Sequence, residues 1–254
     1  MIRAVLFDVG GTLHEVRHPP GLGEQYCQTL LDRLTERGAA LPIGAKELEA
    51  LLHKNAEDYK RWSEEHLTEL PSLRIWNEYY LKDFHLGEEI LSPLAEEFSW
   101  MYDAVRVENV PRPHMRETIR GLREAGYTVG VVSNMISETF VPRLMESYGI
   151  SQYLSCVVVS AQTGLRKPDA RIFEIAAREC GVPLGETAYV GDTLSRDVLG
   201  CRNAHIALSI QIQNPSMAFR DAGLAETGLK ADAVIRDLAE IPGVVEEYNR
   251  RLGR

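Results

Sequence analysis

Short apolar runs alternate with helical patterns along most of this sequence. Residues 2–8 predict a strand, because Ala4-Val5-Leu6-Phe7 is a continuous apolar run. After Pro111 the same alternation continues, with predicted strands at 127–132, 154–159, 188–190, 206–212 and 233–235 and predicted helices at 115–122, 140–148, 172–180 and 194–203. Short apolar strands separated by helices favour a parallel sheet that is covered on both faces. We therefore expect a protein of the α/β class.

The stretch between about residues 20 and 106 shows helical periodicity only. Three apolar stripes mark it, at 48–59, 76–80 and 91–102, and prolines and glycines separate them. All three tryptophans, Trp62, Trp76 and Trp100, fall here and are expected to anchor the core of a small helical bundle. The sequence thus predicts a Rossmann-like parallel-sheet core from residues 1–15 and 110–254, with residues 16–109 inserted as a separate helical domain.

Net charge bears on the binding partners, and cysteine spacing bears on disulfides and zinc sites. The formal net charge of −9 disfavours binding to nucleic acid or to an anionic membrane. An anionic substrate stays possible, because a metal ion and a lysine can reverse the sign locally. The cysteines are scattered and include no CxxC pair, so neither a disulfide nor a zinc site is expected; they are Cys27, Cys156, Cys180 and Cys201.

The beginning of the chain predicts the compartment. It enters a strand directly, which leaves no room for a signal peptide, and no apolar run reaches membrane-spanning length. The cytoplasm is the expected location, and a small molecule is the expected partner.

Polar residues follow several of the predicted strands directly, at the edge where ligands bind to a parallel sheet. Asp8 follows the first strand, Ser133-Asn134 the second, and Asp192 the strand at 188–190, with Asp197 five residues further on. A loop after the strand at 154–159 carries Lys167. Three carboxylates, a lysine and a hydroxyl are therefore expected on one rim.

This set of side chains suggests phosphoryl chemistry. Crowded carboxylates call for a hard cation, and Mg²⁺ is usually held by one or two carboxylates, waters and phosphate oxygens. A lysine opposite them can stabilise charge on a transferring phosphoryl group. A carboxylate can also act as nucleophile and form an aspartyl phosphate.

Four motifs in order, FDVGGTL, VVSN, KPD and GDTLSRD, resemble those of the haloacid dehalogenase superfamily of hydrolases. The motifs and the sheet around them cover residues 1–15 and 110–240. The predicted helical insertion matches the position and character of the family's helical cap domain. The resemblance implies a Rossmann-like core with a cap.

The resemblance also implies a role for each motif residue. Asp8 would be the nucleophile and a metal ligand, Gly10 would offer its carbonyl to the metal, and Lys167 would pair with Asp8 and the phosphoryl group. Asp192 would bind Mg²⁺, and Asp197 would hold the metal's waters or orient Lys167. Ser133 would hydrogen-bond the phosphoryl oxygens, with Asn134 beside it, and both count as catalytic and substrate-binding residues. Gly11 and Thr12 are implied for substrate binding too.

The sequence departs from the family pattern at Gly10. Family phosphatases usually carry an aspartate there, which protonates the leaving oxygen and later activates water. General acid–base catalysis contributes about 10²–10⁴-fold, so the glycine should restrict the substrates that react. Nearby side chains that could supply an acid are His14, Glu15 and His18.

The expected function is therefore a Mg²⁺-dependent phosphatase acting on a small phosphorylated substrate through an aspartyl phosphate. The alternatives left open are a 2-haloacid dehalogenase, whose leaving group needs no proton, and a phosphonatase. The latter would need a lysine from the helical part, for which the candidates are Lys46, Lys54, Lys60 and Lys82. A weakly active phosphate-binding protein is the remaining alternative.

Overall fold

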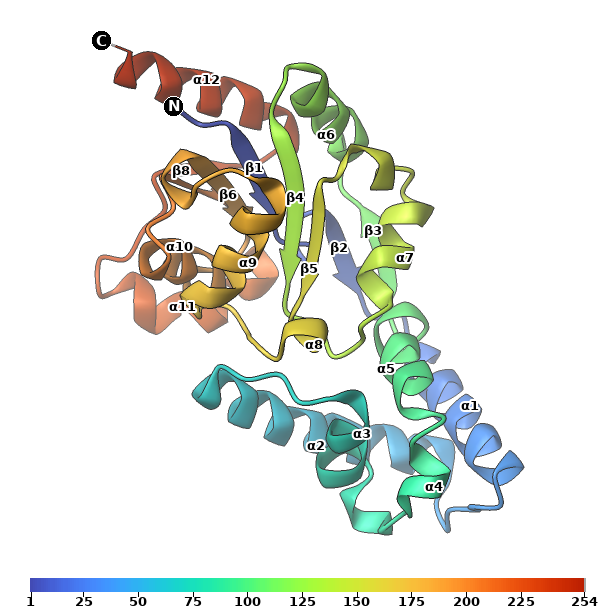
Figure 1. Cartoon of the computed structure of the whole chain (residues 1–254). Coiled ribbons are helices and arrows are strands. Elements are labelled where there is room, and N and C mark those ends of the chain that lie inside the picture. The colour runs from blue at the N-terminus through green and yellow to red at the C-terminus, as the bar shows by residue number, and fades with distance from the viewer. Residues whose placement is uncertain (254) are drawn as a thin grey trace.

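A six-stranded parallel sheet forms the centre of the larger part of the protein, as the computed structural model shows (Figure 1). The structure describes residues 1–253, apart from the side chains of 218–220 and 225, so the predicted end of the core at Arg254 lies outside it. The strand order is β5-β4-β1-β6-β7-β8. The strands are β1 Ala4–Phe7, β4 Thr128–Ser133, β5 Cys156–Val159, β6 Thr187–Gly191, β7 Leu208–Ile212 and β8 Ala233–Ile235. This confirms the predicted α/β class.

The middle strand β1 shows why an apolar run is needed here. Its four residues are all buried, and it pairs in parallel with β4 on one side and β6 on the other, Ala4 facing Thr128 and Thr187. Val5 and Phe7 belong to one hydrophobic cluster and Leu6 to another, because successive side chains of a strand point to opposite faces. Both faces of the sheet are therefore covered.

Helices on the two faces complete these clusters. The helices α6, α7 and α12 contribute to the cluster that contains Val5 and Phe7, and α9 and α10 to the cluster that contains Leu6. The helices of this part are α6 Met115–Glu124, α7 Phe140–Ser147, α8 Ser160–Thr163, α9 Ala170–Cys180, α10 Leu199–Asn203, α11 Ala218–Ala225 and α12 Ile241–Leu252. The single helix predicted at 194–203 is a π-helical turn, η5 (Leu194–Val198), that leads into α10.

Residues 22–104 form what we call the helical segment, which lies beside the sheet at the edge where β1 and β4 end (Figure 1). It has a hydrophobic cluster, which includes Leu30, Leu48 and Phe98 and one residue of the core, Ile136. Of the three tryptophans only Trp76 is fully buried, whereas Trp62 and Trp100 pack at the margin of the cluster. The elements are α1 Leu22–Glu36, α2 Ala45–His66, α3 Ser72–Ile75, the π-helical turn η1 Trp76–Tyr80, α4 Glu88–Leu91 and α5 Ala95–Ala104.

Two short strands that the sequence pattern did not predict join the helical segment to the rest. Strand β2 (His14–Arg17) leads into it and β3 (Glu108–Pro111) leads out, and they pair antiparallel with His14 opposite Pro111. Both are largely polar and only four residues long, so they carry no alternating pattern. The chain therefore enters and leaves the helical segment at one place.

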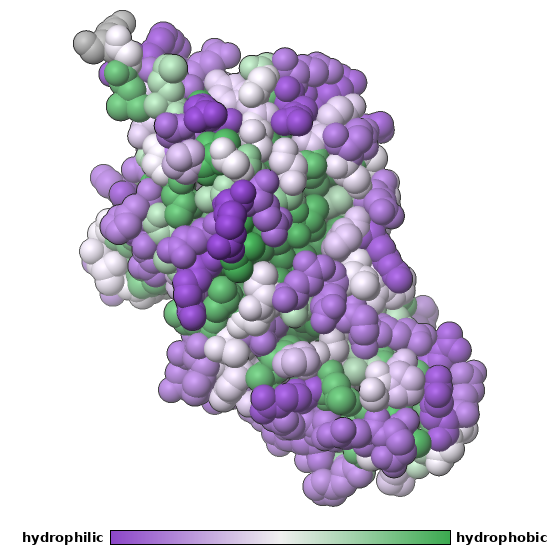
Figure 2. All heavy atoms as spheres, in the orientation of Figure 1, coloured by the Kyte–Doolittle hydropathy of each residue, from purple (hydrophilic) through white to green (hydrophobic). Residues whose placement is uncertain are grey.

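The surface is mostly hydrophilic over the helical segment, and hydrophobic residues show in the middle of the other half, over the strands (Figure 2). Among the described residues, no helix is both long and apolar enough to cross a membrane. All four cysteines are free thiols, and Cys156 and Cys180 bring their Sγ atoms within 3.0 Å of each other. Their wide spacing in the sequence did not predict this proximity.

Candidate active site

The carboxyl ends of three neighbouring strands meet at the centre of the sheet. Asp8 follows β1, Ser133 ends β4, and Asp192 follows β6. Because the strands are parallel and adjacent, residues that are more than a hundred positions apart come to lie on one edge. All three side chains are buried, with exposures of 6% or less.

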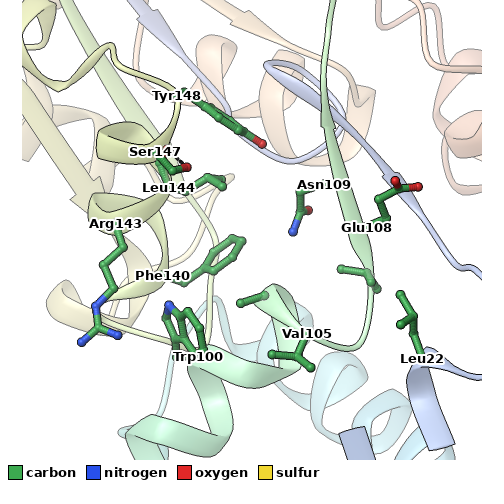
Figure 3. Close-up of a pocket in the computed structure, with 12 residues that line it drawn as sticks. Leu22, Trp100, Val105, Glu108, Asn109, Phe140, Arg143, Leu144, Ser147 and Tyr148 are labelled. Atoms are coloured by element: carbon green, nitrogen blue, oxygen red, sulfur yellow. Dashed lines mark hydrogen bonds between the residues drawn. The ribbon is translucent and has the colours of Figure 1, made fainter. Parts of the chain in front are cut away.

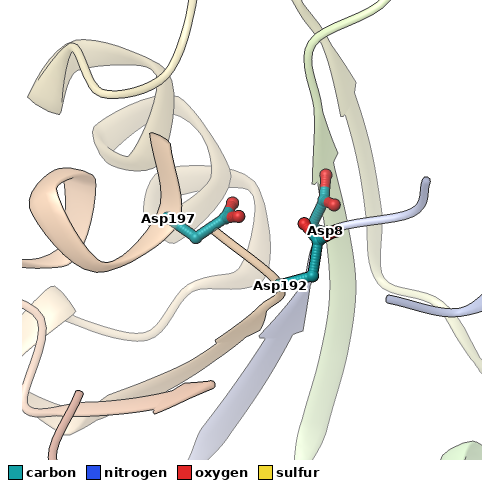
Figure 4. Close-up of side chains that lie close together, drawn as sticks. All are labelled: Asp8, Asp192 and Asp197. Atoms are coloured by element: carbon teal, nitrogen blue, oxygen red, sulfur yellow. The ribbon is translucent and has the colours of Figure 1, made fainter. Parts of the chain in front are cut away.

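Three aspartates converge at this edge (Figure 4). Asp8 and Asp192 extend from the ends of β1 and β6, and Asp197 reaches toward them from η5. One carboxylate oxygen from each lies within 4.8 Å of the others, and all three side chains are buried. Such a cluster concentrates negative charge where water is largely excluded.

Lys167 supplies a positive charge inside the cluster. Its Nζ donates hydrogen bonds to Asp8 Oδ1 at 2.6 Å, to Asp197 Oδ1 at 2.7 Å and to the Tyr189 hydroxyl at 2.8 Å. Burial alone would lower the pKa of Lys167, but the charges of Asp197 and Asp8 outweigh it and the pKa is raised. The lysine is therefore a fixed ammonium beside Asp8.

Asp197 is held by hydrogen bonds at both of its oxygens. Besides Lys167, it accepts bonds from the backbone N–H of Thr193 at 3.0 Å and from the Thr193 hydroxyl at 2.6 Å. Burial alone would raise its pKa, but Lys167 and the nearby Arg196 charge lower it overall. Asp197 is thus an ionised carboxylate that orients the lysine.

Asp192 has spare capacity to bind a cation. Its Oδ1 is buried and has no hydrogen-bond partner among the described residues, whereas its Oδ2 accepts a bond from Asn214 Nδ2 at 2.7 Å. Burial, with the charges of Asp8 and Asp197, raises its pKa to about 7. Carboxylate oxygens crowded in this way are the ligands that a hard divalent cation prefers, so the residues present fit Mg²⁺.

The turn after Asp8 is shaped by its two glycines. Gly11 has φ +85°, and a Cβ built on it would lie 2.1 Å from Asp192 Oδ2, so a side chain there is excluded twice over. Gly10 has no positive φ, and its nearest neighbour would be His14 Nε2 at 3.9 Å. Thr12 donates a hydrogen bond from its hydroxyl to Asp8 Oδ2 at 3.3 Å.

Of the three side chains expected as substitutes for an acid at Gly10, only His14 lies beside it. His14 is 1% exposed, and burial, helped by the Arg112 charge, lowers its pKa to about 4. Glu15 is exposed and pairs with Arg17, and His18 is exposed too. At neutral pH the imidazole of His14 is therefore uncharged.

Asn134 holds the lysine loop in place. Its Nδ2 donates to the carbonyl of Lys167 at 3.0 Å, and its Oδ1 accepts from the N–H of Lys167 at 2.8 Å. The side chain predicted to lie at the substrate thus bonds to the backbone of the lysine through both its nitrogen and its oxygen. Ser133, one residue before it, is buried at the end of β4.

The model of the haloacid dehalogenase-like hydrolase family matches residues 2–205, well over half of the chain. The chain belongs to the haloacid dehalogenase-like hydrolases. This confirms the resemblance carried by the four motifs, and the protein is accordingly a hydrolase.

Named relatives of this hydrolase include several phosphatases. It is 28% identical over 204 residues to a glyceraldehyde 3-phosphate phosphatase of Methanopyrus kandleri, covering 80% of this chain and 81% of the relative. A glyceraldehyde 3-phosphate phosphatase of Methanothermobacter thermautotrophicus is 27% identical over 247 residues, covering 96% and 100%. A phosphoglycolate phosphatase of Agrobacterium fabrum is 31% identical over 171 residues, covering 66% and 70%.

Solved structures share the fold of this hydrolase. A 2-haloacid dehalogenase from Pseudomonas syringae superposes with a TM-score of 0.66 at 21% identity, covering 98% of this chain and all of that one. A phosphatase of the same superfamily from Thermococcus onnurineus gives a TM-score of 0.61 at 23% identity, covering 96% and 98%. At such identities the likeness concerns the fold alone, and it agrees with the parallel sheet described above.

Several residues at the hydrolase's site were missed in the sequence. Tyr189 lies within an apolar strand and reads as a core residue, although its hydroxyl accepts from Lys167. Asn214 stands two residues after β7, so the strand-end pattern that located Asp192 could have found it. Arg112 donates two hydrogen bonds to the carbonyl of Gly11, at 3.0 and 2.8 Å, and nothing in the sequence pairs these residues.

Arg196 is a further missed cation of the hydrolase's site. Burial alone would lower its pKa, but the charges of Asp197, Asp192 and Asp8 raise it overall. It lies inside the motif GDTLSRD, where only the two aspartates had been assigned a role. The acidic cluster therefore has two positive neighbours, Lys167 and Arg196.

A separate pocket of about 620 Å³ lies where the helical segment meets α7 and β3 (Figure 3). Trp100 and Phe140 form its apolar wall, and Asn109, Arg143 and Tyr148 surround it with polar atoms. None of the predicted site residues lines it. It is distinct from the aspartate cluster.

Proposed function

We propose that the protein is a Mg²⁺-dependent phosphatase that acts on a small phosphorylated substrate through an aspartyl phosphate on Asp8. The observation that carries the proposal is the contact of Lys167 Nζ with Asp8 Oδ1 inside a cluster of three buried carboxylates. A cation fixed at a carboxylate in a buried site suits a reaction in which an anionic group approaches that carboxylate. The phosphatases among its named relatives support the same reading.

Asp8 is the proposed nucleophile. Thr12 contacts one of its oxygens and Lys167 the other, so the carboxylate has a fixed orientation at the end of β1. One oxygen attacks phosphorus, the bond from phosphorus to the leaving oxygen breaks, and water later cleaves the acyl phosphate. Lys167 balances the charge of the phosphoryl oxygens, and the Ser133 hydroxyl is proposed to donate to one of them.

Asp8, Asp192 and the carbonyl of Gly10 are the proposed ligands of Mg²⁺. When bound, the ion would neutralise phosphoryl charge and keep the carboxylates ionised. The unpartnered Oδ1 of Asp192 supports a direct role for this residue. Asp197, whose two oxygens already accept bonds from Lys167 and Thr193, is proposed to act mainly by orienting the lysine.

We also propose the two-domain division, with residues 1–15 and 110–254 as the catalytic core and residues 16–109 as the cap. Nearly all buried members of one hydrophobic cluster come from the helical segment, with Ile136 the core's contribution, and the chain crosses to and from the segment through β2 and β3. A cap over the aspartates would exclude water from the reaction and select the substrate. The named relatives suggest a short phosphorylated carbon compound, and Gly11 and Thr12 are proposed to contact its phosphoryl group.

A dehalogenase is the second candidate function, favoured by the absence of a carboxylic acid at Gly10. A halide leaves without a proton, so it needs no such group. The intact acidic cluster argues against it, because displacement of a halide by a carboxylate requires no metal ion. For a phosphonatase the lysines are poorly placed, since Lys46 and Lys54 are exposed and Lys60 and Lys82 pair with Glu57 and Asp58 on the helical segment.

A substrate panel tests the proposal. Phosphate esters, acyl phosphates, phosphonates and 2-haloacids are assayed with Mg²⁺ and with a chelator, using wild type and Asp8→Asn. Turnover of phosphorylated compounds that needs both Mg²⁺ and Asp8 is expected. Chelator-resistant release of halide would instead establish the dehalogenase, and tight binding of phosphate without turnover would establish a phosphate-binding protein.

A further inference from the structure

A carboxylate of the helical segment reaches into the core close to the site lysine. Glu69 lies in the connection between α2 and α3, which runs beside α8 (Figure 1), and it is 3% exposed. The backbone of this connection pairs with the loop before Lys167: Glu69 N–H donates to the Gly164 carbonyl at 3.0 Å, and Arg166 N–H to the Leu67 carbonyl at 3.1 Å. The two loops thus form a short antiparallel contact.

Three side chains donate hydrogen bonds to the Glu69 carboxylate. Tyr59 of the helical segment donates from its hydroxyl to Oε1, and Arg166 of the core donates from Nη1 to Oε2. Ser160, also of the core, donates to Oε2 at 2.7 Å. A buried carboxylate is costly unless it is paired in this way. Two of the three donors belong to the core, so the full set of bonds exists only while the helical segment sits on the core.

These bonds continue to the active site by two short routes. Arg166 is bonded covalently to Lys167. The Ser160 hydroxyl accepts a hydrogen bond from the N–H of Met135 at 2.7 Å, and Met135 follows Asn134 directly. The two routes meet, because the side chain of Asn134 bonds to the backbone N–H and C=O of Lys167.

We propose that Glu69 is a positioning residue that places Lys167 against Asp8 only when the helical segment lies on the core. It does so by closing a ring of hydrogen bonds and peptide bonds that runs through Arg166, Lys167, Asn134, Met135 and Ser160. The inference rests on the proposed function for its effect on catalysis. The ring itself is a structural feature that can be measured without turnover. It gives the helical segment a direct role in assembling the site.

Glu96 provides a matched control. It is a second carboxylate of the helical segment that binds a core loop. It accepts hydrogen bonds from Ser137, from Thr139 and from the N–H of Glu138. Its contacts in that loop begin at Ser137, and none is made to Arg166, Lys167 or Asn134. Glu96→Gln should therefore weaken the contact between the helical segment and the core without breaking the ring.

The test compares Glu69→Gln, Ser160→Ala and Glu96→Gln with the wild type. In Glu69→Gln we expect kcat to fall about 10–100-fold while KM changes little, because residues that orient others typically act on this scale. Glu96→Gln should lower thermal stability about as much as Glu69→Gln does, but its kcat should stay within about threefold of the wild-type value. Ser160→Ala, which deletes a single hydroxyl, should lower kcat in the same direction as Glu69→Gln.

Hydrogen exchange of the Lys167 and Met135 amides is measured on the same proteins without substrate. Faster exchange at both amides in Glu69→Gln, and not in Glu96→Gln, is expected. Unchanged exchange in Glu69→Gln, or equal changes in the two variants, would overturn the inference even if the wild type is a phosphatase. If Glu69→Gln fails to fold, the Lys167 amide in Ser160→Ala decides it, and unchanged exchange there would overturn the inference. A wild type inactive on every phosphate ester would refute the proposed function alone.

Discussion

Gly10→Asp is the substitution that most directly probes the missing acid. The backbone of Gly10 has no positive φ, and a Cβ would meet His14 Nε2 at 3.9 Å, an ordinary contact distance. Replacing glycine at a compatible position changes the free energy of unfolding by about 1 kcal/mol or less. The variant should therefore fold. Gly11→Asp, with φ +85° and a Cβ 2.1 Å from Asp192, should not tolerate the same change.

The size of the effect follows from what a general acid contributes. Without an acid, the leaving oxygen departs as an anion, so the rate depends steeply on its basicity. A positioned acid contributes about 10²–10⁴-fold where the leaving group is poor. Gly10→Asp should raise kcat/KM for alkyl phosphates by up to this factor and change it little for aryl or acyl phosphates.

The assay is kcat/KM against leaving-group pKa for wild type, Gly10→Asp and Gly10→Asn, all with Mg²⁺. A flatter dependence in Gly10→Asp alone is expected, because asparagine has the same size and no acidic proton. Equal slopes in the three folded proteins would show that another group already protonates the leaving oxygen in the wild type.

Three further predictions concern the metal, pH and packing. Asp192→Ala should weaken Mg²⁺ binding, measured by calorimetry, more than Asp197→Ala, whose oxygens are occupied by Lys167 and Thr193; the reverse order would contradict the assignment. Because burial depresses the pKa of His14 from 6.5 to about 4, His14 adds stability above pH 6.5 that is lost as the pH falls toward 4. Between pH 6.5 and pH 4, the free energy of unfolding measured by denaturation should then fall by about 3 kcal/mol more in wild type than in His14→Phe. An equal fall in the two proteins would exclude this. A short reagent with two thiol-reactive groups should alkylate Cys156 and Cys180 together and so link them, leaving Cys27 outside the link, which peptide mapping checks.

Much of the sheet, and of the edge that carries the three aspartates, could be predicted from the sequence. Buried parallel strands must be apolar along their whole length, and the polar residues that follow them must gather at one edge. Asp8, Ser133 and Asp192 were located on this basis, and the structure brings them together. The strand at 206–212 was predicted two residues too early, because Ile206 and Ala207 are apolar but precede the paired part of β7.

Contacts between distant polar residues could not be predicted. The pairing of β2 with β3 depends on segments about ninety residues apart, neither of which has an alternating pattern. The burial of Glu69 against Arg166 was equally hidden, since a glutamate after a helix usually faces solvent. The two hydrogen bonds between the Asn134 side chain and the backbone of Lys167 depend on loop geometry that residue types do not specify.

Asp8 is proposed to attack phosphorus and to carry the phosphoryl group. The most direct measurement is mass spectrometry of the peptide that contains Asp8, after acid quench of a single turnover on a reactive acyl or aryl phosphate with Mg²⁺. One phosphoryl group on Asp8, formed and lost at rates that account for turnover and absent in Asp8→Asn, is the predicted result. Full turnover with no modification of Asp8, or with the phosphoryl group on another residue, would exclude Asp8 as the nucleophile.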